Sequence, residues 1–156
     1  MNEARHDVDV VREMYRAFER ADVGRSLELC APEVTVHQSP AVPWGGDYTG
    51  RDGVVRFLTA LGGALDSRPE TERLFADGDG RVVQVGRTRG TVRRTGRRFD
   101  VAETHVWTVR DGLVVRFEAY IDVPAMLPAL APDDEHDRTS GVPAPVGASV
   151  PGVGAS

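Results

Sequence analysis

The segment from Arg97 to Asp122 limits the possible folds of this chain more than any other. It predicts two β-strands joined at Arg110-Asp111-Gly112, because Asp-Gly between two alternating runs is a strong hairpin signal. In the second strand every other residue is apolar, so one of its faces should cover a core. These apolar residues are Leu113, Val115, Phe117, Ala119 and Ile121.

The first strand of this hairpin carries a more mixed row. One of its alternate sets combines two aromatic side chains with a carboxylate and an imidazole: Phe99, Val101, Glu103, His105 and Trp107. Burying Glu103 and His105 costs free energy unless each has a polar partner. The row therefore indicates a cavity with polar groups in its wall.

Length and composition set further bounds. A chain of 156 residues fits one domain, and a net charge of −5 gives no support for a nucleic-acid or anionic-membrane partner. No apolar run approaches the roughly 20 residues of a membrane span, and no signal peptide opens the chain. Cys30, the only cysteine, excludes an internal disulfide and suits a reducing cytoplasm, the location that we expect.

The remaining segments predict helices first and long strands afterwards. The predicted elements are a helix from about Asp7 to Ala21, a short helix capped by Asp22, a strand at Val34–His37, a loop at Gln38–Thr49, a helix from Gly50 to Leu65, strands at Thr71–Phe75 and Arg81–Arg94, the hairpin, and a helix at Val123–Leu130 with Asp122 as N-cap. Arginines between Arg87 and Arg98 flank a turn and favour a solvated ribbon tip over a phosphate site. Residues 1–130 should form one domain, and the Pro/Gly/Ala-rich residues 131–156 a disordered tail.

This order predicts an α+β fold, in which a curled, cone-shaped antiparallel sheet packs against about three N-terminal helices. A strongly curved sheet leaves space between its concave face and the helices, where a ligand can enter. The loop at Gln38–Thr49 holds Trp44 and Tyr48, which favours a place at the lip of a binding site.

Four sequence segments between residues 7 and 130 resemble those of a known protein family. They are VVREMYRAFERAD in the first helix, SLELCAPEVTVH into the first strand, GRDGVVRFL in the third helix and ETHVWTVRDGLVVRFEAYID at the end. In these the chain resembles the nuclear-transport-factor-2-like superfamily, and within it the SnoaL-like and ketosteroid-isomerase-like proteins. The resemblance implies the cone-shaped fold, but the same cone hosts isomerases, cyclases, epoxide hydrolases, dehydratases and non-catalytic modules.

Compared with ketosteroid isomerases, the chain departs at the reactive positions. Gln38 stands where the catalytic aspartate is expected, and a neutral amide cannot abstract a proton. The oxyanion tyrosine of the first helix falls at Met14 or the adjacent Tyr15, and the second oxyanion donor at or beside His105. Resemblance to SnoaL-like cyclases instead implies Glu103, His105 and Asp122 as the polar set.

His105 is the leading catalytic candidate, because an imidazole can donate or accept a proton near neutral pH. Glu103 is either a base or the partner of a neighbouring arginine, and Asp122 is either a base or only the helix N-cap. The expected ligand walls are Tyr15, Phe18, His37, Gln38, Trp44, Tyr48, Phe57, Trp107 and Phe117. The two strand histidines have no metal-ligand spacing and no phosphate loop occurs, so we expect neither a metal nor another cofactor.

The leading hypothesis is a cofactor-independent enzyme that acts on a small hydrophobic carbonyl metabolite, polyketide- or terpenoid-like, by cyclisation, isomerisation or dehydration. Alternatives are a binding protein without turnover, an epoxide hydrolase or epoxide-opening cyclase that uses Asp100 or Arg87, and a dimerising module whose cone is filled by side chains. The resemblance also implies a homodimer through the face that carries Arg116, Glu118 and Tyr120.

Overall fold

The computed structural model describes residues 2–132 of the chain. Its elements are α1 (Asn2–Glu19), α2 (Val23–Glu28), β1 (Cys30–Gln38), β2 (Gly46–Thr49), α3 (Gly50–Ala64), β3 (Leu65–Ala76), β4 (Arg81–Val92), β5 (Arg98–Arg110), β6 (Leu113–Ile121) and α4 (Val123–Leu130). A disordered tail was predicted for residues 131–156, and residues 133–156 of it lie outside the described residues.

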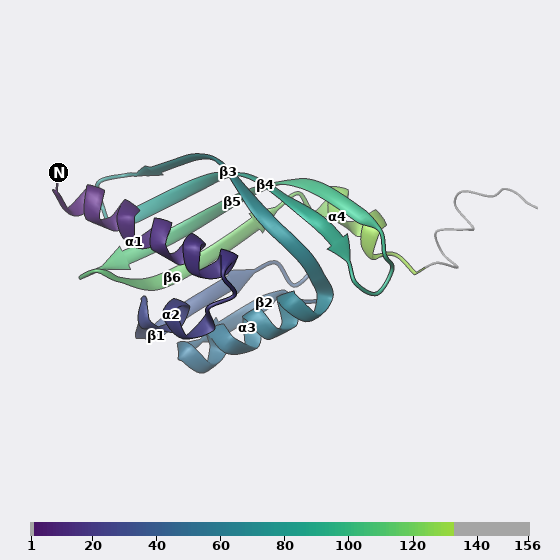
Figure 1. The fold of residues 1–156 in the computed structure, drawn as a ribbon, viewed down its shortest axis with the longest axis horizontal. Coiled ribbons are helices and arrows are strands. Elements are labelled where there is room, and N and C mark those ends of the chain that lie inside the picture. The colour runs from purple at the N-terminus through teal and green to yellow at the C-terminus, as the bar shows by residue number, and fades with distance from the viewer. Residues whose placement is uncertain (1, 133–156) are drawn as a thin grey trace, which may run out of the picture.

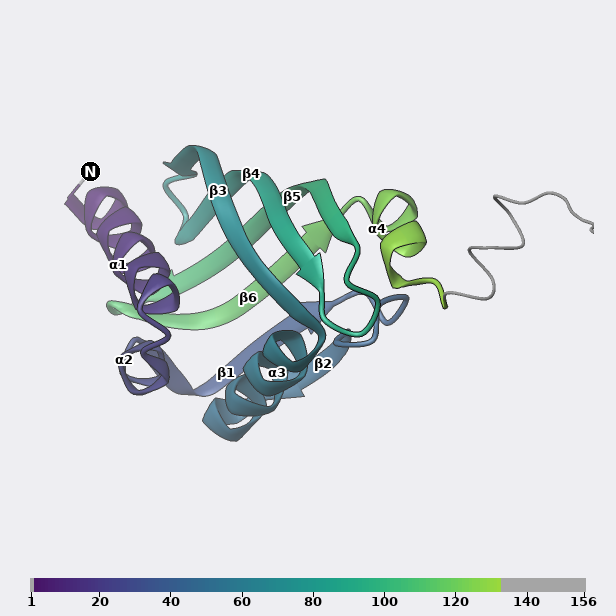
Figure 2. The same cartoon turned by 45° about the vertical axis from the view of Figure 1, so that its right-hand side comes forward.

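The strands form one curled sheet of six in the order β2-β1-β6-β5-β4-β3. Helices α1, α2 and α3 lie on the concave side, and α4 lies at the far end of the sheet (Figures 1 and 2). The predicted α+β fold is thus confirmed. The sheet is antiparallel except between β1 and β6, which run parallel.

Two segments differ from the sequence-based expectation. The predicted loop at Gln38–Thr49 contains β2, which pairs with β1 at the edge of the sheet. Strand β3 is longer than predicted and includes Pro69, a residue that an edge strand tolerates because its N–H is not needed for a ladder.

A register shift also changes part of the predicted core row. Between β5 and β6 the pairing shifts at Thr108/Val109, so Val114 is fully buried while its neighbours Leu113 and Val115 are only partly buried. One extra residue in a strand reverses which side chains face the core. From Phe117 to Tyr120, buried side chains alternate with more exposed ones as predicted.

Two glycines allow β3 to curl closely over β4. A Cβ atom would lie 2.0 Å from the Glu70 carbonyl oxygen at Gly86 and 2.1 Å from that of Asp66 at Gly90. Any side chain there would force the two strands apart. These positions therefore support the curvature that opens the concave face.

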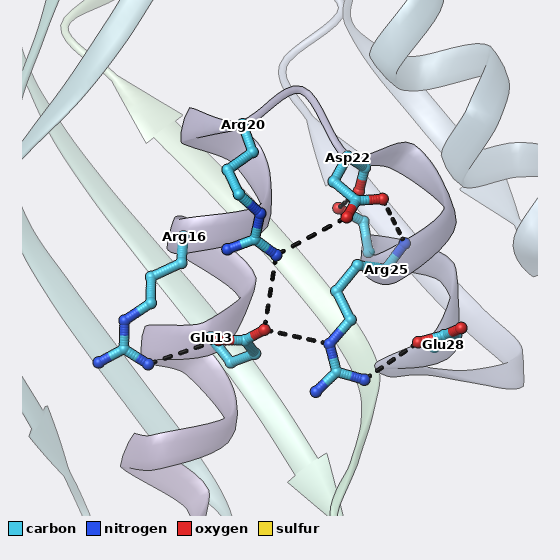
Figure 3. A network of polar contacts seen from close by, with 7 residues as sticks. Glu13, Arg16, Arg20, Asp22, Arg25 and Glu28 are labelled. Atoms are coloured by element: carbon cyan, nitrogen blue, oxygen red, sulfur yellow. Dashed lines mark hydrogen bonds and ion pairs between the residues drawn. The ribbon is translucent and has the colours of Figure 1, made fainter.

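A surface network holds α2 against α1 (Figure 3). Glu13 of α1 lies 3.4 Å from Arg16, 3.6 Å from Arg20 and 3.1 Å from Arg25 of α2. The hydrogen bond from Arg25 contributes most to lowering the pKa of the Glu13 carboxyl. Exposed pairs of this kind are individually weak, but together they fix the orientation of α2.

The tip of the β4–β5 hairpin binds the C-terminal end of α4. Arg94 donates to the Leu130 carbonyl at 2.6 Å and Thr95 to the Ala129 carbonyl at 2.8 Å. These bonds satisfy carbonyl groups that a helix end leaves without partners, and the cation suits the helix dipole. The tip predicted to be merely solvated is therefore a helix cap.

Candidate functional site

The concave face encloses a cavity of about 490 Å³, within the usual size range of small-molecule sites. Its polar centre comes from α1 and β5, which supply Tyr15, Glu103 and His105. Glu103 and His105 are two residues apart on β5, so their side chains share the inner face. They are 5% and 8% exposed, respectively.

A hydrogen-bonded chain joins α1 to β5. The Trp107 indole donates from Nε1 to Tyr15 Oη at 2.9 Å, and Tyr15 Oη lies 2.7 Å from His105 Nδ1. The indole can only donate, so the tyrosine oxygen accepts from it and its own proton is available to the imidazole. Tyr15 is thereby held against the imidazole ring of His105, the leading catalytic candidate.

A second set of contacts holds the other side of the imidazole. His105 Nε2 lies 3.2 Å from Glu103 Oε1, and Glu103 Oε2 accepts a hydrogen bond from Gln84 Nε2 at 3.0 Å. Gln84 also donates to Thr71 Oγ1 at 3.2 Å. The carboxylate beside Nε2 favours a proton on that nitrogen, which leaves Nδ1 free to accept from Tyr15.

The environment keeps the Tyr15 hydroxyl protonated. Burial is the largest influence and raises its pKa above the ordinary value near 10, and the Glu103 charge acts in the same direction. The hydrogen bond from Trp107 opposes these effects but is outweighed. Tyr15 is therefore suited to donate a proton or hydrogen bond at neutral pH and not to act as a base.

Apolar side chains form most of the remaining wall. Of the expected wall residues, those that line the cavity besides Tyr15 are Phe18, Gln38, Trp44, Phe57 and Phe117. Trp107 lies deeper, packed on Phe117 with ring centroids 4.2 Å apart, and borders a small apolar void beneath the cavity. The bottom of the cone is thus packed, while its centre is open.

Besides Trp107, three predicted site residues lie outside the cavity lining. Asp122 is exposed and accepts a hydrogen bond from the Ala125 N–H at 3.2 Å, so it is the N-cap of α4. His37 lies on the outer face of β1 and contacts Asp47. Tyr48 packs against Phe57 with ring centroids 5.5 Å apart.

The alternatives based on other residues gain little from the geometry. Arg87 and Asp100 form an ion pair at 2.6 Å near the surface, and neither lines the cavity, so the residues expected for epoxide opening lie outside it. The arginines that line the cavity are Arg68 and Arg93. The size of the cavity also argues against a cone filled by side chains. Gln84 was not among the predicted site residues. The available signal was its place in an alternating row with Val82, Gly86 and Thr88, which puts it on the inner face of β4.

Within residues 2–132, no three side chains of His, Cys, Asp or Glu gather where they could hold a metal ion. In the same part of the chain, no helix is long and apolar enough to cross a membrane.

The fold agrees with comparisons to known proteins. The model of the SnoaL-like domain matches residues 11–117, and the chain belongs to this family. An uncharacterized protein of Mycobacterium tuberculosis, Rv0034, is 30% identical over 121 residues, which cover 76% of this chain and 91% of the relative.

Solved structures show the same architecture. An NTF2-like protein of Burkholderia thailandensis superposes with a TM-score of 0.75 and 32% identity, covering 81% of this chain and 98% of that one. TerC, co-crystallized with polyporic acid, gives a TM-score of 0.72 and 25% identity, covering 80% of this chain and 98% of TerC.

Proposed function

We propose that the protein is a cofactor-independent acid–base enzyme that acts on a small hydrophobic carbonyl compound. The observation that carries this proposal is the hydrogen-bonded chain Trp107–Tyr15–His105–Glu103, whose last three residues line the cavity. A protonated hydroxyl, an imidazole and a carboxylate at one point supply both the donor and the base that enolisation needs.

In the proposed reaction, Glu103 removes a proton from the carbon next to the substrate carbonyl. The C–H electron pair forms the carbon–carbon double bond of an enolate, and the carbonyl π pair moves to oxygen. Tyr15 turns its O–H from His105 Nδ1 to that oxygen and stabilises it by hydrogen bonding, while His105 keeps its Nε2 proton toward Glu103 and positions both groups. The proton on Glu103 then has one of three destinations. Its return to a different carbon isomerises the substrate. Its transfer to the alkoxide that forms when the enolate carbon attacks a second carbonyl completes a cyclisation, and its transfer to a β-hydroxyl, whose C–O bond breaks as the enolate electrons form the new carbon–carbon double bond, releases water.

Asp122 has no role in this proposal, because its carboxylate caps α4 outside the cavity. The polyketide- or terpenoid-like character of the substrate rests on family membership and on the apolar wall formed by Phe18, Phe57 and Phe117. Polyporic acid, the compound co-crystallized with TerC, is a suitable first probe for binding.

Proton exchange in deuterated water tests the proposal without knowledge of the natural substrate. The bicyclic ketone 2-tetralone has acidic protons next to its carbonyl, and NMR follows their replacement by deuterium. We expect the protein to accelerate this exchange, and Glu103→Gln to lose about a hundredfold of the acceleration. His37→Gln, a variant of the outer-face histidine, is the matched control and should retain it.

The same experiment separates an enzyme from a carrier. A ligand-binding protein without turnover is the second candidate, favoured by the fact that Tyr15 and His105 hydrogen-bond to each other. Binding of 2-tetralone without accelerated exchange would support the carrier. Equal exchange by the native protein and Glu103→Gln would show that Glu103 is not the base.

We also propose that the protein forms a homodimer through the outer face of the sheet. This face carries the partly buried Val85 and Val106 next to the oppositely charged Arg116 and Glu118. A two-fold interface uses the same patch twice, so a patch with both signs of charge can complement itself. Sedimentation equilibrium should give twice the chain mass, and Val85→Glu should give the monomer.

A further inference from the structure

Gln38 is a polar side chain in the cavity wall without a role in the proposed reaction. Gln38, at the end of β1, is 3% exposed and lines the cavity. Within residues 2–132 its side-chain amide makes no hydrogen bond. Among the described residues the only buried side-chain N or O atom without a partner is Gln84 Oε1, so the amide atoms of Gln38 are accessible from the cavity and free to bond a ligand there.

The register of the sheet gives its position relative to the catalytic cluster. Gln38 pairs with Ala119 of β6, and Ala119 pairs with His105 of β5, so the three residues form one row across the inner face. Two strand spacings, about 10 Å, therefore separate the backbone at Gln38 from that at His105. The small side chain of Ala119 leaves the space between them open to the cavity.

The surroundings of Gln38 determine which chemistry it can recognise. The charged residues that line the cavity lie outside β1: Glu19 on α1, Asp22 before α2, Asp66 and Arg68 on β3, Arg93 after β4, and Glu103 on β5. Trp44, which is 1% exposed, lines the cavity from the neighbouring turn. An amide supplies one donor group and one acceptor but no charge, so a charged ligand group would remain uncompensated here.

We propose that Gln38 is a second recognition point, which binds an uncharged hydroxyl or carbonyl oxygen of the ligand. The ligand would carry this oxygen at the opposite end of an apolar body from the group held by Tyr15, His105 and Glu103. This inference rests on the proposed function, because it takes that cluster as the first recognition point. It narrows the substrate class to compounds with two oxygen groups, one at each end.

Two rigid phenols test the inference directly. 4-Hydroxybiphenyl has one hydroxyl, and 4,4′-dihydroxybiphenyl has a second hydroxyl at the far end of the same body. Isothermal titration calorimetry with the full chain should show that the diol binds about tenfold more tightly, the gain expected from one good hydrogen bond. In Gln38→Met, which keeps the side-chain length but lacks the amide, both probes should bind within about twofold of each other.

Further variants make the outcome decisive. His37→Gln changes the adjacent outward-facing residue of β1 and should retain the tenfold preference, while thermal melting confirms that each variant folds. If Gln38→Met does not fold, Gln38→Leu replaces it. Equal affinity of the native protein for both probes, or a preference that survives the loss of the amide, would overturn the inference. Failure of the proposed function is distinct: the diol preference would depend on Gln38, but no ketone proton would exchange.

Discussion

The two faces of the sheet each carry a histidine beside a carboxylate, and the two pairs differ in almost every other respect. On the inner face, His105 Nε2 lies 3.2 Å from Glu103, with side chains 10% and 3% exposed. On the outer face, His37 Nδ1 lies only 2.8 Å from Asp47, with side chains 30% and 78% exposed. The closer pair is the one that water can reach.

The difference teaches that the number of hydrogen-bond partners and the burial of the pair, more than the histidine–carboxylate distance, distinguish the candidate site. His105 has Tyr15 on its second ring nitrogen and, beyond Glu103, the amide of Gln84. His37 has the ring of Tyr120 nearby, with centroids 6.1 Å apart. A network shielded from water strengthens each of its bonds and makes the loss of any one costly.

Removing one hydroxyl from each face should produce the largest contrast. Tyr15→Phe leaves both the Trp107 indole N–H and His105 Nδ1 without their partner, which should lower the free energy of unfolding by about 2 kcal/mol. Tyr120→Phe removes a hydroxyl from a side chain that is 45% exposed and should change it by less than about 0.5 kcal/mol.

Urea unfolding followed by circular dichroism measures both values. Equal losses for the two variants would show that the inner chain of hydrogen bonds contributes nothing beyond a surface contact. A loss in Tyr15→Phe that disappears when Trp107 is also replaced by Phe would confirm that the two residues act together.

Sequence reasoning succeeded where the signal is local. The hairpin turn has positive φ at both Asp111 (52°) and Gly112 (78°), the backbone that Asp-Gly favours. Period-two alternation likewise put Glu103 and His105 in one row, and the Pro-containing segment after Asp122 is the predicted α4. Each of these features depends on residues that are neighbours in the chain.

The site itself depends on residues that are far apart. Tyr15 contacts a histidine 90 positions later, and Gln84 reaches Glu103 from the next strand, so no local pattern reveals either contact. Asp122 shows the opposite limitation. Its sequence position fits both a base and a cap, and only the direction of its side chain distinguishes them.

Alkaline titration should give an intermediate effect. The folded chain holds the Tyr15 proton because burial raises its pKa, whereas the unfolded chain loses it near the ordinary value of 10. The contribution of Tyr15 to stability is therefore complete below pH 10 and falls as pH rises above it, by up to about 1.4 kcal/mol per pH unit. The Cys30 thiol, whose pKa burial raises to about 11 from 9.0, adds a decline between those values.

Urea unfolding at a series of pH values above 9 isolates the tyrosine. Tyr15→Phe should lose stability less steeply than the native protein above pH 10, while the Cys30 contribution remains in both. The pKa of Tyr120 is also raised, chiefly by its hydrogen bond to Glu118, but its exposure makes Tyr120→Phe the weaker variant. Identical slopes for the native protein and Tyr15→Phe would contradict the assignment of Tyr15 as a buried, protonated donor.

Salt should produce the smallest effect and also distinguish the two histidine pairs. Asp47→Asn removes the charge from an exposed pair, so the free energy of unfolding should change by less than about 1 kcal/mol at low ionic strength. At about 0.5 M NaCl this change should nearly vanish, because ions screen charges that water reaches. The effect of Glu103→Gln should change little between the two salt concentrations, because a carboxylate that is only 5% exposed is screened much less than a surface charge. If both variants lost their effect in salt, the inner carboxylate would be as solvated as the outer one, and the environment required for its role as a base would be absent.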